Sequence, residues 1–270
     1  MEKYLSIAKE LIVTAGNTIR EKIKLEDKDI QQKLLPSDLV TVVDREVEEY
    51  LIKNLKKEFP THNFVTEELN YDQIIKSDGS SYTWVIDPID GTMNFVHGFS
   101  RYSISMALLK GKEVMVALIL DINNRNLYTA EKGKGAYMND QPIQCSMTTT
   151  MAKGLIAVGF SSNQWHKDND LPSLLNRFIG KCHGLRITGS SCLDLVEVAK
   201  GELDGFWHFQ LKPWDIAAGI LIVREAGGHV SDLEGNKEVL YAPCIVATNS
   251  KIHKEVVEAI IDSKEAVKAV

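Results

Sequence analysis

The feature that most constrains this chain is a buried strand that runs directly into two closely spaced carboxylates. Residues 84–86 read Trp-Val-Ile, an apolar run that predicts a buried strand. Asp87 and Asp90 follow on either side of Pro88, which fixes φ and lacks an amide hydrogen, so we expect the chain to leave the strand and turn there. Because ligand sites of open α/β sheets lie beyond the carboxyl ends of strands, both acids are candidate site residues.

The residues around these acids suit both a cation and an anion. Gly91 has no Cβ atom, so its backbone can approach a ligand closely, and the amides of Gly91 and Thr92 can face a phosphate. Asp87 and Asp90 offer the oxygen ligands that Mg²⁺ prefers, and we expect the turn to leave the carbonyl of Ile89 free to coordinate. A hard cation beside a phosphate indicates metal-dependent phosphate chemistry.

The first 140 residues predict two helices and a mainly antiparallel sheet. Apolar residues recur at helical spacing over residues 3–25 and again over 43–55, and Pro60 ends the second helix. The polar segment 24–39 between them reads as a loop. Short strands separated by hairpin-type turns are predicted at residues 64–65, 82–86, 104–109, 114–120 and 127–129. We expect both helices to pack on this sheet.

From residue 141 to residue 270 strands and helices alternate. Strands are predicted at residues 155–158, 185–187, 206–208, 229–231 and 245–247. Helices are predicted at residues 166–178, 190–200, 215–226 and 251–262. The pattern therefore predicts two differently built halves, residues 1–140 and 141–270, that together complete one site.

Length and charge exclude several classes of protein. A chain of 270 residues can bury a large core, and a net charge of −6 gives no reason to expect nucleic acid or an anionic membrane as a partner. No apolar run reaches the roughly 18 residues that span a bilayer, and the N-terminus opens an amphipathic helix rather than a secretory signal. We expect a cytoplasmic protein.

The segment from Asp87 to Thr92, Asp-Pro-Ile-Asp-Gly-Thr, resembles the signature of the inositol monophosphatase family, which are magnesium-dependent, lithium-sensitive phosphatases. Other pieces of the family pattern occur in the family's order, and the resemblance covers about residues 33–232. These pieces are Asp38 to Thr41 with Asp44, Glu67-Glu68, Trp214-Asp215, and Glu225 to Gly228. The resemblance implies an α+β or α/β fold, a layered α-β-α-β-α sandwich of the inositol monophosphatase and fructose-1,6-bisphosphatase type. It also implies a homodimer.

The resemblance further implies a site for two to three Mg²⁺ ions. Adjacent residues on an extended segment point in opposite directions, so we expect only one of Glu67 and Glu68 to bind metal directly. By similarity Glu67 binds metal and orients the attacking water, while Glu68 supports the site. Taken alone, Asp215 could instead cap a helix. The implied metal ligands are Glu67, Asp87, Ile89, Asp90 and Asp215.

The same resemblance assigns the water-activating residues. The hydroxyl of Thr92, paired with Asp44, is expected to hold or deprotonate the attacking water, with no Ser, Cys or His nucleophile required. Asp44 taken alone could be a helix cap or an exposed helix acid. Lys33 and Asp38 flank the predicted loop, where the family carries a third, weaker metal site near the phosphate. Both of these residues could equally be solvated.

Substrate contacts are implied for residues of the second half. The family contacts the alcohol portion of the substrate from the positions of Gly189, Ser190 and Ser191, and Asp90 and Asp215 lie beside the substrate. Ser190 is also a candidate helix cap. At position 208 animal inositol monophosphatases have a glutamate. Here His208 can donate or accept a hydrogen bond and can carry positive charge, which opens room for a second phosphate or a nucleotide.

These observations predict a magnesium-dependent phosphomonoesterase that hydrolyses a small polyol phosphate, first of all myo-inositol 1-phosphate. Alternatives within the class are the 2′-phosphate of NADP(H), fructose 1,6-bisphosphate and a 3′-phosphoadenosine nucleotide. An alternative of another class is non-catalytic partner binding, since some bacterial relatives act on the transcription machinery.

Overall fold

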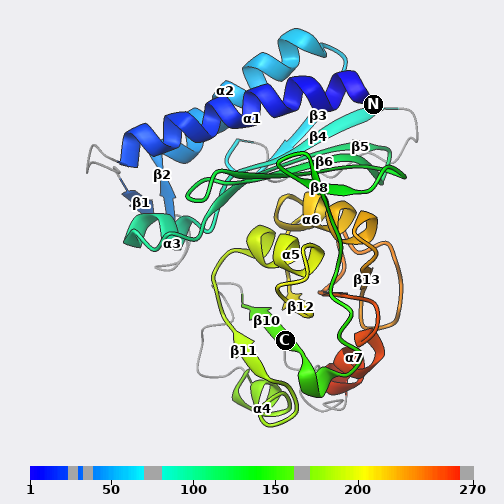
Figure 1. Ribbon diagram of the computed structural model, residues 1–270. Helices are drawn as coiled ribbons and strands as arrows, with labels where there is room; N and C mark the ends of the chain where they lie inside the picture. The colour runs from blue at the N-terminus through cyan, green and yellow to red at the C-terminus, as the bar shows by residue number, and fades with distance from the viewer. Residues whose placement is uncertain (24–29, 33–38, 70–80, 161–170, 262–270) are drawn as a thin grey trace.

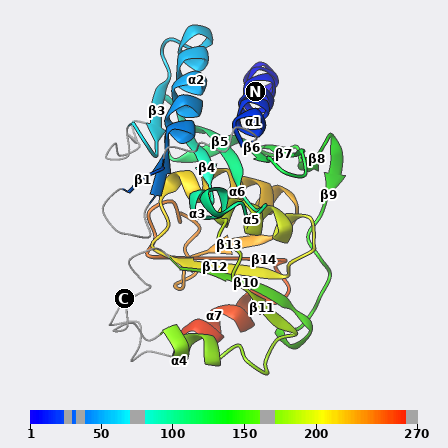
Figure 2. The ribbon, with the colours of Figure 1, turned by 90° about the vertical axis from the view of Figure 1, so that its left-hand side faces the viewer.

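Helices and sheets alternate in five layers (Figure 1; Figure 2). The structure is a computed structural model that describes residues 1–23, 30–32, 39–69, 81–160 and 171–261. The layers are, in order, helices α1 (Glu2–Ile23) and α2 (Val42–Glu58), a seven-stranded sheet, helices α5 (Ser191–Ala199) and α6 (Pro213–Glu225), a five-stranded sheet, and helices α4 (Leu171–Asn176) and α7 (His253–Ile261). The predicted α-β-α-β-α sandwich is confirmed.

The seven-stranded sheet is antiparallel except at one edge, where its first two strands run parallel. The strand order follows the chain, as expected for strands joined by short turns. Its members are β3 (Asn63–Thr66), β4 (Tyr82–Asp90), β5 (Ser103–Lys110), β6 (Glu113–Asp121), β7 (Asn126–Glu131), β8 (Ala136–Met138) and β9 (Gln141–Ile143).

Helices α1 and α2 cover the outer face of this sheet (Figure 1). Ile12 and Ile19 of α1 and Leu51 and Leu55 of α2 are fully buried, and they pack in one cluster with Trp84 of β4. These are the positions that recur at helical spacing, so burial of one apolar stripe per helix stabilises the layer. The two predicted helices are confirmed.

The strand that carries the two acids continues further than predicted. β4 runs through Pro88 to Asp90 rather than ending before the proline. Asp87 pairs with Ser105 and Asp90 with Ser103, so three steps on β4 match two on β5, and the extra residue forms a bulge. The prediction of a turn at Pro88 was wrong, because a bulge tolerates a residue that cannot donate to the ladder.

The segment predicted as a loop between α1 and α2 contains a two-stranded antiparallel sheet. β1 (Ile30–Gln32) pairs with β2 (Leu39–Thr41), which leads directly into α2. The prediction of an all-loop segment was therefore wrong for these residues. Lys33 and Asp38 lie outside the described residues.

The five-stranded sheet is mixed and follows the order β11-β10-β12-β14-β13. β10 is parallel to both of its neighbours, whereas β14 is antiparallel to both of its own. The predicted alternation holds, apart from part of the helix expected at 166–178, of which residues 166–170 lie outside the described residues. The strands are β10 (Leu155–Gly159), β11 (Gly184–Arg186), β12 (Gly205–Phe209), β13 (His229–Ser231) and β14 (Cys244–Thr248).

Three apolar clusters fill the spaces between the layers. The largest joins both sheets through α5 and α6, so residues from both predicted halves share one core. The division near residue 140 stays a prediction. No helix within the described ranges is both long and apolar enough to cross a membrane.

Candidate metal and phosphate site

The two acids of the central motif are the last carboxylates of β4. Asp87 is almost completely buried, and its Oδ1 accepts a hydrogen bond from the amide of Ile89 at 3.0 Å. Asp90 ends the strand and is also buried. In a regular strand, side chains three residues apart point to opposite faces. The bulge between Asp87 and Asp90 breaks this alternation at the carboxyl end of the strand.

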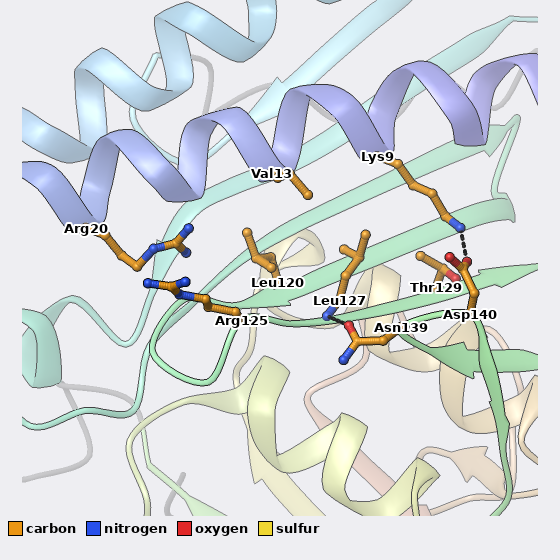
Figure 3. Close-up of a pocket in the computed structure, with 9 residues that line it drawn as sticks. All are labelled: Lys9, Val13, Arg20, Leu120, Arg125, Leu127, Thr129, Asn139 and Asp140. Atoms are coloured by element: carbon orange, nitrogen blue, oxygen red, sulfur yellow. Dashed lines mark hydrogen bonds and ion pairs between the residues drawn. The ribbon is translucent and has the colours of Figure 1, made fainter.

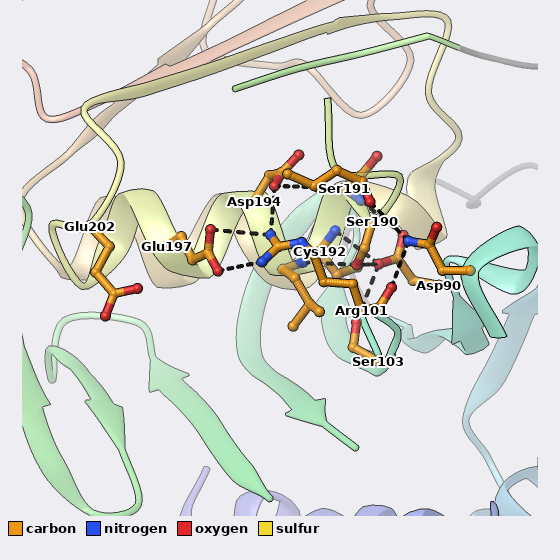
Figure 4. Close-up of polar contacts among 12 residues, drawn as sticks. Asp90, Arg101, Ser103, Ser190, Ser191, Cys192, Asp194, Glu197 and Glu202 are labelled. Carbon is orange, nitrogen blue, oxygen red and sulfur yellow. Dashed lines mark hydrogen bonds and ion pairs between the residues drawn. The ribbon is translucent and has the colours of Figure 1, made fainter. Parts of the chain in front are cut away.

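Asp90 is held by groups from two different elements (Figure 4). Its Oδ2 accepts hydrogen bonds from the Ser103 hydroxyl at 3.2 Å, from the Ser190 hydroxyl, and from the Cys192 amide at 3.2 Å. Its Oδ1 accepts one bond, from the Ser191 amide at 3.1 Å. The carboxylate therefore lies against the first amides of α5, where the helix dipole favours negative charge, and Oδ1 keeps a lone pair for another partner.

Glu67 is presented by a turn directly after β3. A buried residue that sequence reasoning missed, Glu48 of α2, organises this turn. It accepts hydrogen bonds from the Thr66 hydroxyl at 2.7 Å, the Glu68 amide at 2.9 Å and the Leu69 amide at 2.7 Å. Glu67 and Glu68 thus lie in a turn rather than on an extended segment. Their side chains are both half-buried.

Asp44 is fully buried at the start of α2. Its Oδ2 accepts bonds from the amide of Thr41 at 2.8 Å and from the Thr41 hydroxyl at 2.5 Å, which forms a capping box. Its Oδ1 lies 3.4 Å from the Thr92 hydroxyl, as expected for the predicted pair. Thr92 also donates to the carbonyl of Ile89 at 2.9 Å, so that carbonyl is not free, although it retains a second lone pair.

Asp215 approaches from the start of α6. It is the third residue of that helix, and its Oδ2 accepts a bond from the amide of Lys212 at 2.7 Å. Pro213 occupies the first turn, where its missing amide hydrogen costs nothing. Asp215 therefore stabilises the helix start without being the cap residue itself.

These carboxylates raise one another's proton affinity. The pKa of Asp87 lies well above its ordinary value because the group is buried and because Glu67, Asp90, Asp215 and Asp44 are close by. Burial, followed by Glu67, also raises the pKa of Asp215 well above its ordinary value. Negative groups collected in a buried place favour a bound cation, which relieves their repulsion.

The donor set fits magnesium in kind, because it consists of carboxylate and carbonyl oxygens. Within the described part of the chain, however, no three Asp, Glu, His or Cys side chains are arranged to hold a metal ion at once. Asp90 and Asp215 instead turn toward backbone donors. Magnesium commonly takes only one or two carboxylates and keeps several waters, so the set is compatible with it without forming a closed cage.

Two of the residues predicted to contact the substrate alcohol, Ser190 and Ser191, hydrogen-bond Asp90. Ser190 caps α5 by accepting from the Leu193 amide at 3.3 Å, as expected for a helix cap, and its hydroxyl donates to Asp90. Gly91 has φ of +89°, and a Cβ atom there would lie 2.9 Å from the Arg101 carbonyl and 3.2 Å from the Gly189 carbonyl. A side chain at position 91 would therefore meet the backbone of the loops before β5 and α5.

His208 is a buried histidine of the five-stranded sheet. It lies on β12, in the interior of its sheet, and Nδ1 is 2.6 Å from the Phe209 carbonyl, so Nδ1 carries the proton. Burial lowers the pKa of His208 to about 4. Burial thus disfavours the positive charge that the sequence allows for this ring, and room for a second phosphate or a nucleotide beside it stays a prediction. Whether His208 contacts substrate stays a prediction.

A separate pocket of about 350 Å³ lies between α1 and the sheet (Figure 3). It contains none of the predicted site residues. Lys9 and Asp140 form an ion pair at one end, and Arg20 and Arg125 lie at the other. The pocket is therefore distinct from the carboxylate site.

Comparison with known proteins assigns the chain to a family. The family model described as "Inositol monophosphatase family" matches residues 1–265. This chain belongs to the inositol monophosphatase family. It is accordingly a phosphatase of the phosphoric monoester hydrolase class, and the resemblance found in the sequence is confirmed.

Individual relatives match over nearly the whole chain. A Nus factor SuhB of Pseudomonas aeruginosa is 37% identical over 96% of this chain and 96% of its own length. An inositol-1-monophosphatase of Mesorhizobium japonicum is 34% identical over 95% of each chain. The crystal structure of the suppressor protein suhB from Bartonella henselae has a TM-score of 0.89 at 32% identity, covering 97% of this chain and 99% of that one.

One more distant relative has been solved with two different ligands. SaIMPase-II, 26% identical, is known bound to inositol monophosphate and bound to 2′AMP, with TM-scores of 0.83 and 0.84. Both structures cover 99% of this chain, and this chain covers 97% and 98% of them.

Proposed function

We propose that this chain is a Mg²⁺-dependent phosphomonoesterase that acts on a small polyol phosphate, with myo-inositol 1-phosphate as the first candidate. The observation that carries the proposal is the gathering of Asp44, Glu67, Asp87, Asp90 and Asp215 around the end of β4 in a chain of this family. These carboxylates come from four separated parts of the sequence, and the fold brings them together at one place.

Asp87 and Asp90 would hold the cation, and Glu67, Asp215 and the carbonyl of Ile89 would complete the set of protein oxygens. When bound, Mg²⁺ supplies positive charge to the phosphate oxygens and makes water a stronger nucleophile at neutral pH. We propose that two to three such ions bind.

The protein's own groups position the water and the phosphate. The Thr92 hydroxyl would orient the attacking water, and Asp44 Oδ1, at 3.4 Å from that hydroxyl, would receive the proton that the water loses. The amides of Gly91 and Thr92 would bind the phosphate, and Glu68 would support Glu67. We propose that Gly189, Ser190, Ser191 and His208 face the alcohol portion, with His208 neutral.

The relatives support some of the candidate substrates more than others. Relatives named inositol-1-monophosphatase favour a polyol phosphate. The SaIMPase-II complex with 2′AMP supports the 2′-phosphate of NADP(H) as the main alternative. Fructose 1,6-bisphosphate and 3′-phosphoadenosine 5′-phosphate complete the set.

The decisive experiment measures phosphate release from inositol 1-phosphate, NADP, 2′AMP, fructose 1,6-bisphosphate and 3′-phosphoadenosine 5′-phosphate, each with Mg²⁺ or with EDTA. We expect release from one or two of these compounds, only with Mg²⁺, and the panel then identifies the substrate. If no compound releases phosphate with Mg²⁺, the proposed activity on this class is wrong.

The Nus factor relatives favour a second candidate function, binding to a protein of the transcription machinery. The test is capture of RNA polymerase and its associated factors by the purified Asp90→Asn protein in EDTA. A binding role should survive the loss of metal and of turnover. Absence of every such factor from the captured material would contradict this candidate.

We also propose a homodimer, which light scattering of the purified protein would measure directly.

A further inference from the structure

Arg101 lies between helix α3 (Thr92–His97) and β5, which begins at Ser103, and its guanidinium reaches across to α5 (Figure 4). One nitrogen, Nη1, donates to Glu197 Oε1 at 2.7 Å. The other, Nη2, donates to Asp194 Oδ1 at 2.9 Å and to Glu197 Oε2 at 3.1 Å. The guanidinium thus binds two acids three residues apart, which lie on one face of the helix.

The acceptors are well shielded from water. The side chain of Asp194 is 2% exposed, that of Glu197 is 20% exposed and that of Arg101 is 22% exposed. Burial raises the pKa of Asp194 to about 7, while the Thr188 hydroxyl, at 2.6 Å, and Arg101 lower it. A partly buried ion pair of this kind holds its partners in a defined geometry, and loss of one partner leaves the other uncompensated.

The backbone around Arg101 makes the same connection. The side-chain amide of Asn94 donates to the Arg101 carbonyl at 2.8 Å and to the Thr188 carbonyl at 2.9 Å. The loop before β5 and the loop before α5 are therefore tied together both by Asn94 and by the Arg101 guanidinium.

These two loops lead to the groups that hold Asp90. Ser103 follows Arg101 by two residues, and Ser190, Ser191 and Cys192 follow Thr188 at the start of α5. Within the described part of the chain, the hydrogen bonds that the Asp90 carboxylate accepts from Ser103, Ser190, Ser191 and Cys192 thus come from the two segments that Arg101 joins. A change in their separation would rotate the Asp90 carboxylate or release one of its oxygens.

We infer that Arg101 is a positioning residue. Through Asp194 and Glu197 it fixes the start of α5 against β5, so that Asp90 presents one oxygen to Mg²⁺. The inference rests on the proposed function for the role of Asp90. Arg101 itself is not among the residues proposed to hold the substrate or the metal, and its guanidinium binds Asp194 and Glu197.

The test compares the Arg101→Gln protein with the unchanged protein. Groups that orient a metal ligand typically change metal affinity by about 10- to 100-fold when they are removed. We expect the Mg²⁺ concentration for half-maximal activity to rise about tenfold, with the rate at saturating Mg²⁺ much less affected. Calorimetric titration of Mg²⁺ into the substrate-free protein should show the same weakening.

Two further variants separate positioning from general stability. Arg101→Lys keeps the charge but not the forked geometry, and it should recover part of the Mg²⁺ affinity. Lys200→Gln removes the ion pair between Lys200 and Glu202, at 2.7 Å near the other end of α5, and should leave the Mg²⁺ affinity unchanged. Circular dichroism and a thermal melt verify that each variant is folded.

The inference is overturned if folded Arg101→Gln binds Mg²⁺ within twofold of the unchanged protein, or if Lys200→Gln weakens binding equally. If Arg101→Gln does not fold, Arg101→Lys decides, since an unchanged Mg²⁺ affinity in that variant also overturns the inference. A failure of the proposed function looks different, because the unchanged protein would then neither bind Mg²⁺ at this site nor release phosphate.

Discussion

At the scale of single residues, Asp90 combines two roles. It stabilises the fold, because it accepts bonds from β5 and from the first turn of α5. It also keeps one lone pair on Oδ1 for a further partner. A residue with both roles should be sensitive to loss of its charge even when its shape is retained.

We predict that Asp90→Asn abolishes turnover while the protein remains folded. Asparagine has the same shape, but it presents a neutral group, so the cation loses a charged ligand worth several kcal/mol of transition-state stabilisation, about a thousandfold in rate. Steady-state phosphate release measures the loss. The matched control is Asp121→Asn, since Asp121 is equally buried, at 7%, but caps the turn at Asn123 and Asn124. Retained Mg²⁺-dependent activity in Asp90→Asn would contradict the assignment.

His208 makes the free energy of unfolding depend on pH. Its pKa is about 4 in the folded protein against an ordinary 6.5, because burial penalises the charged ring. Between these values the unfolded chain binds a proton that the folded protein does not bind. The stability is therefore complete above pH 6.5 and is lost as the pH falls toward 4, by up to about 1.4 kcal/mol per pH unit.

Urea unfolding at several pH values measures this dependence. We expect a shallower loss of stability between pH 6.5 and 4 in His208→Gln than in the unchanged protein. His183→Gln, at an exposed histidine, is the matched control for the loss of a histidine. An unchanged slope in His208→Gln would show that this ring titrates as in water.

At the scale of elements, the contact between α5 and α6 sets the middle layer. Gly219 of α6 faces Leu195 of α5 so closely that a Cβ atom would lie 2.3 Å from Leu195 Cδ1 and 2.7 Å from its Cβ. Leu195 is fully buried and cannot move aside without disturbing the shared core. A glycine at this position therefore determines how near the two helices approach.

We predict that Gly219→Ala destabilises the protein by about 1–3 kcal/mol, the usual cost of overpacking a core. Denaturant unfolding measures the change. In the double variant with Leu195→Ala the overlap with Leu195 Cδ1 is removed and only the contact with its Cβ remains, so the combined loss should be smaller than the sum of the two single losses. If the two single losses add up to the loss of the double variant, the contact between Gly219 and Leu195 does not set the distance between the helices.

At the scale of the whole molecule, metal binding should increase the free energy of unfolding. The carboxylates around β4 come from α2, the turn after β3, β4 and α6, so they gather only in the folded chain. A cation bound there favours the folded state by mass action. At a Mg²⁺ concentration 100 times its dissociation constant the gain is about 2.7 kcal/mol. A thermal melt in Mg²⁺ and in EDTA should differ accordingly, and identical melts would contradict the site.

Lithium provides a second test at this scale. We predict that Li⁺ inhibits the Mg²⁺-dependent phosphatase activity by taking one Mg²⁺ position, whereas the same concentration of Na⁺ serves as the control for ionic strength. Phosphate release at constant Mg²⁺ and increasing Li⁺ measures the effect. Activity that is insensitive to high Li⁺ would count against the prediction.

The sequence by itself determined most of the helices and strands and the family. Periodic apolar residues predict α1, α2 and most strands, because burial of one face depends on local spacing. The motif from Asp87 to Thr92 indicates metal-dependent phosphate chemistry, because its residue types are those that bind a hard cation and an anion. Even the pair between Thr92 and Asp44 follows from the family pattern.

Only the tertiary structure decided what surrounds these residues. Glu48 and Arg101 are distant in sequence from the groups they hold, and nothing in their local context distinguishes them from solvated charges. The bulge at Pro88 depends on pairing with β5, and the neutral state of His208 depends on its burial between β10 and β14. Residue type follows from sequence, whereas desolvation and long-range hydrogen bonding exist only when separate segments pack together.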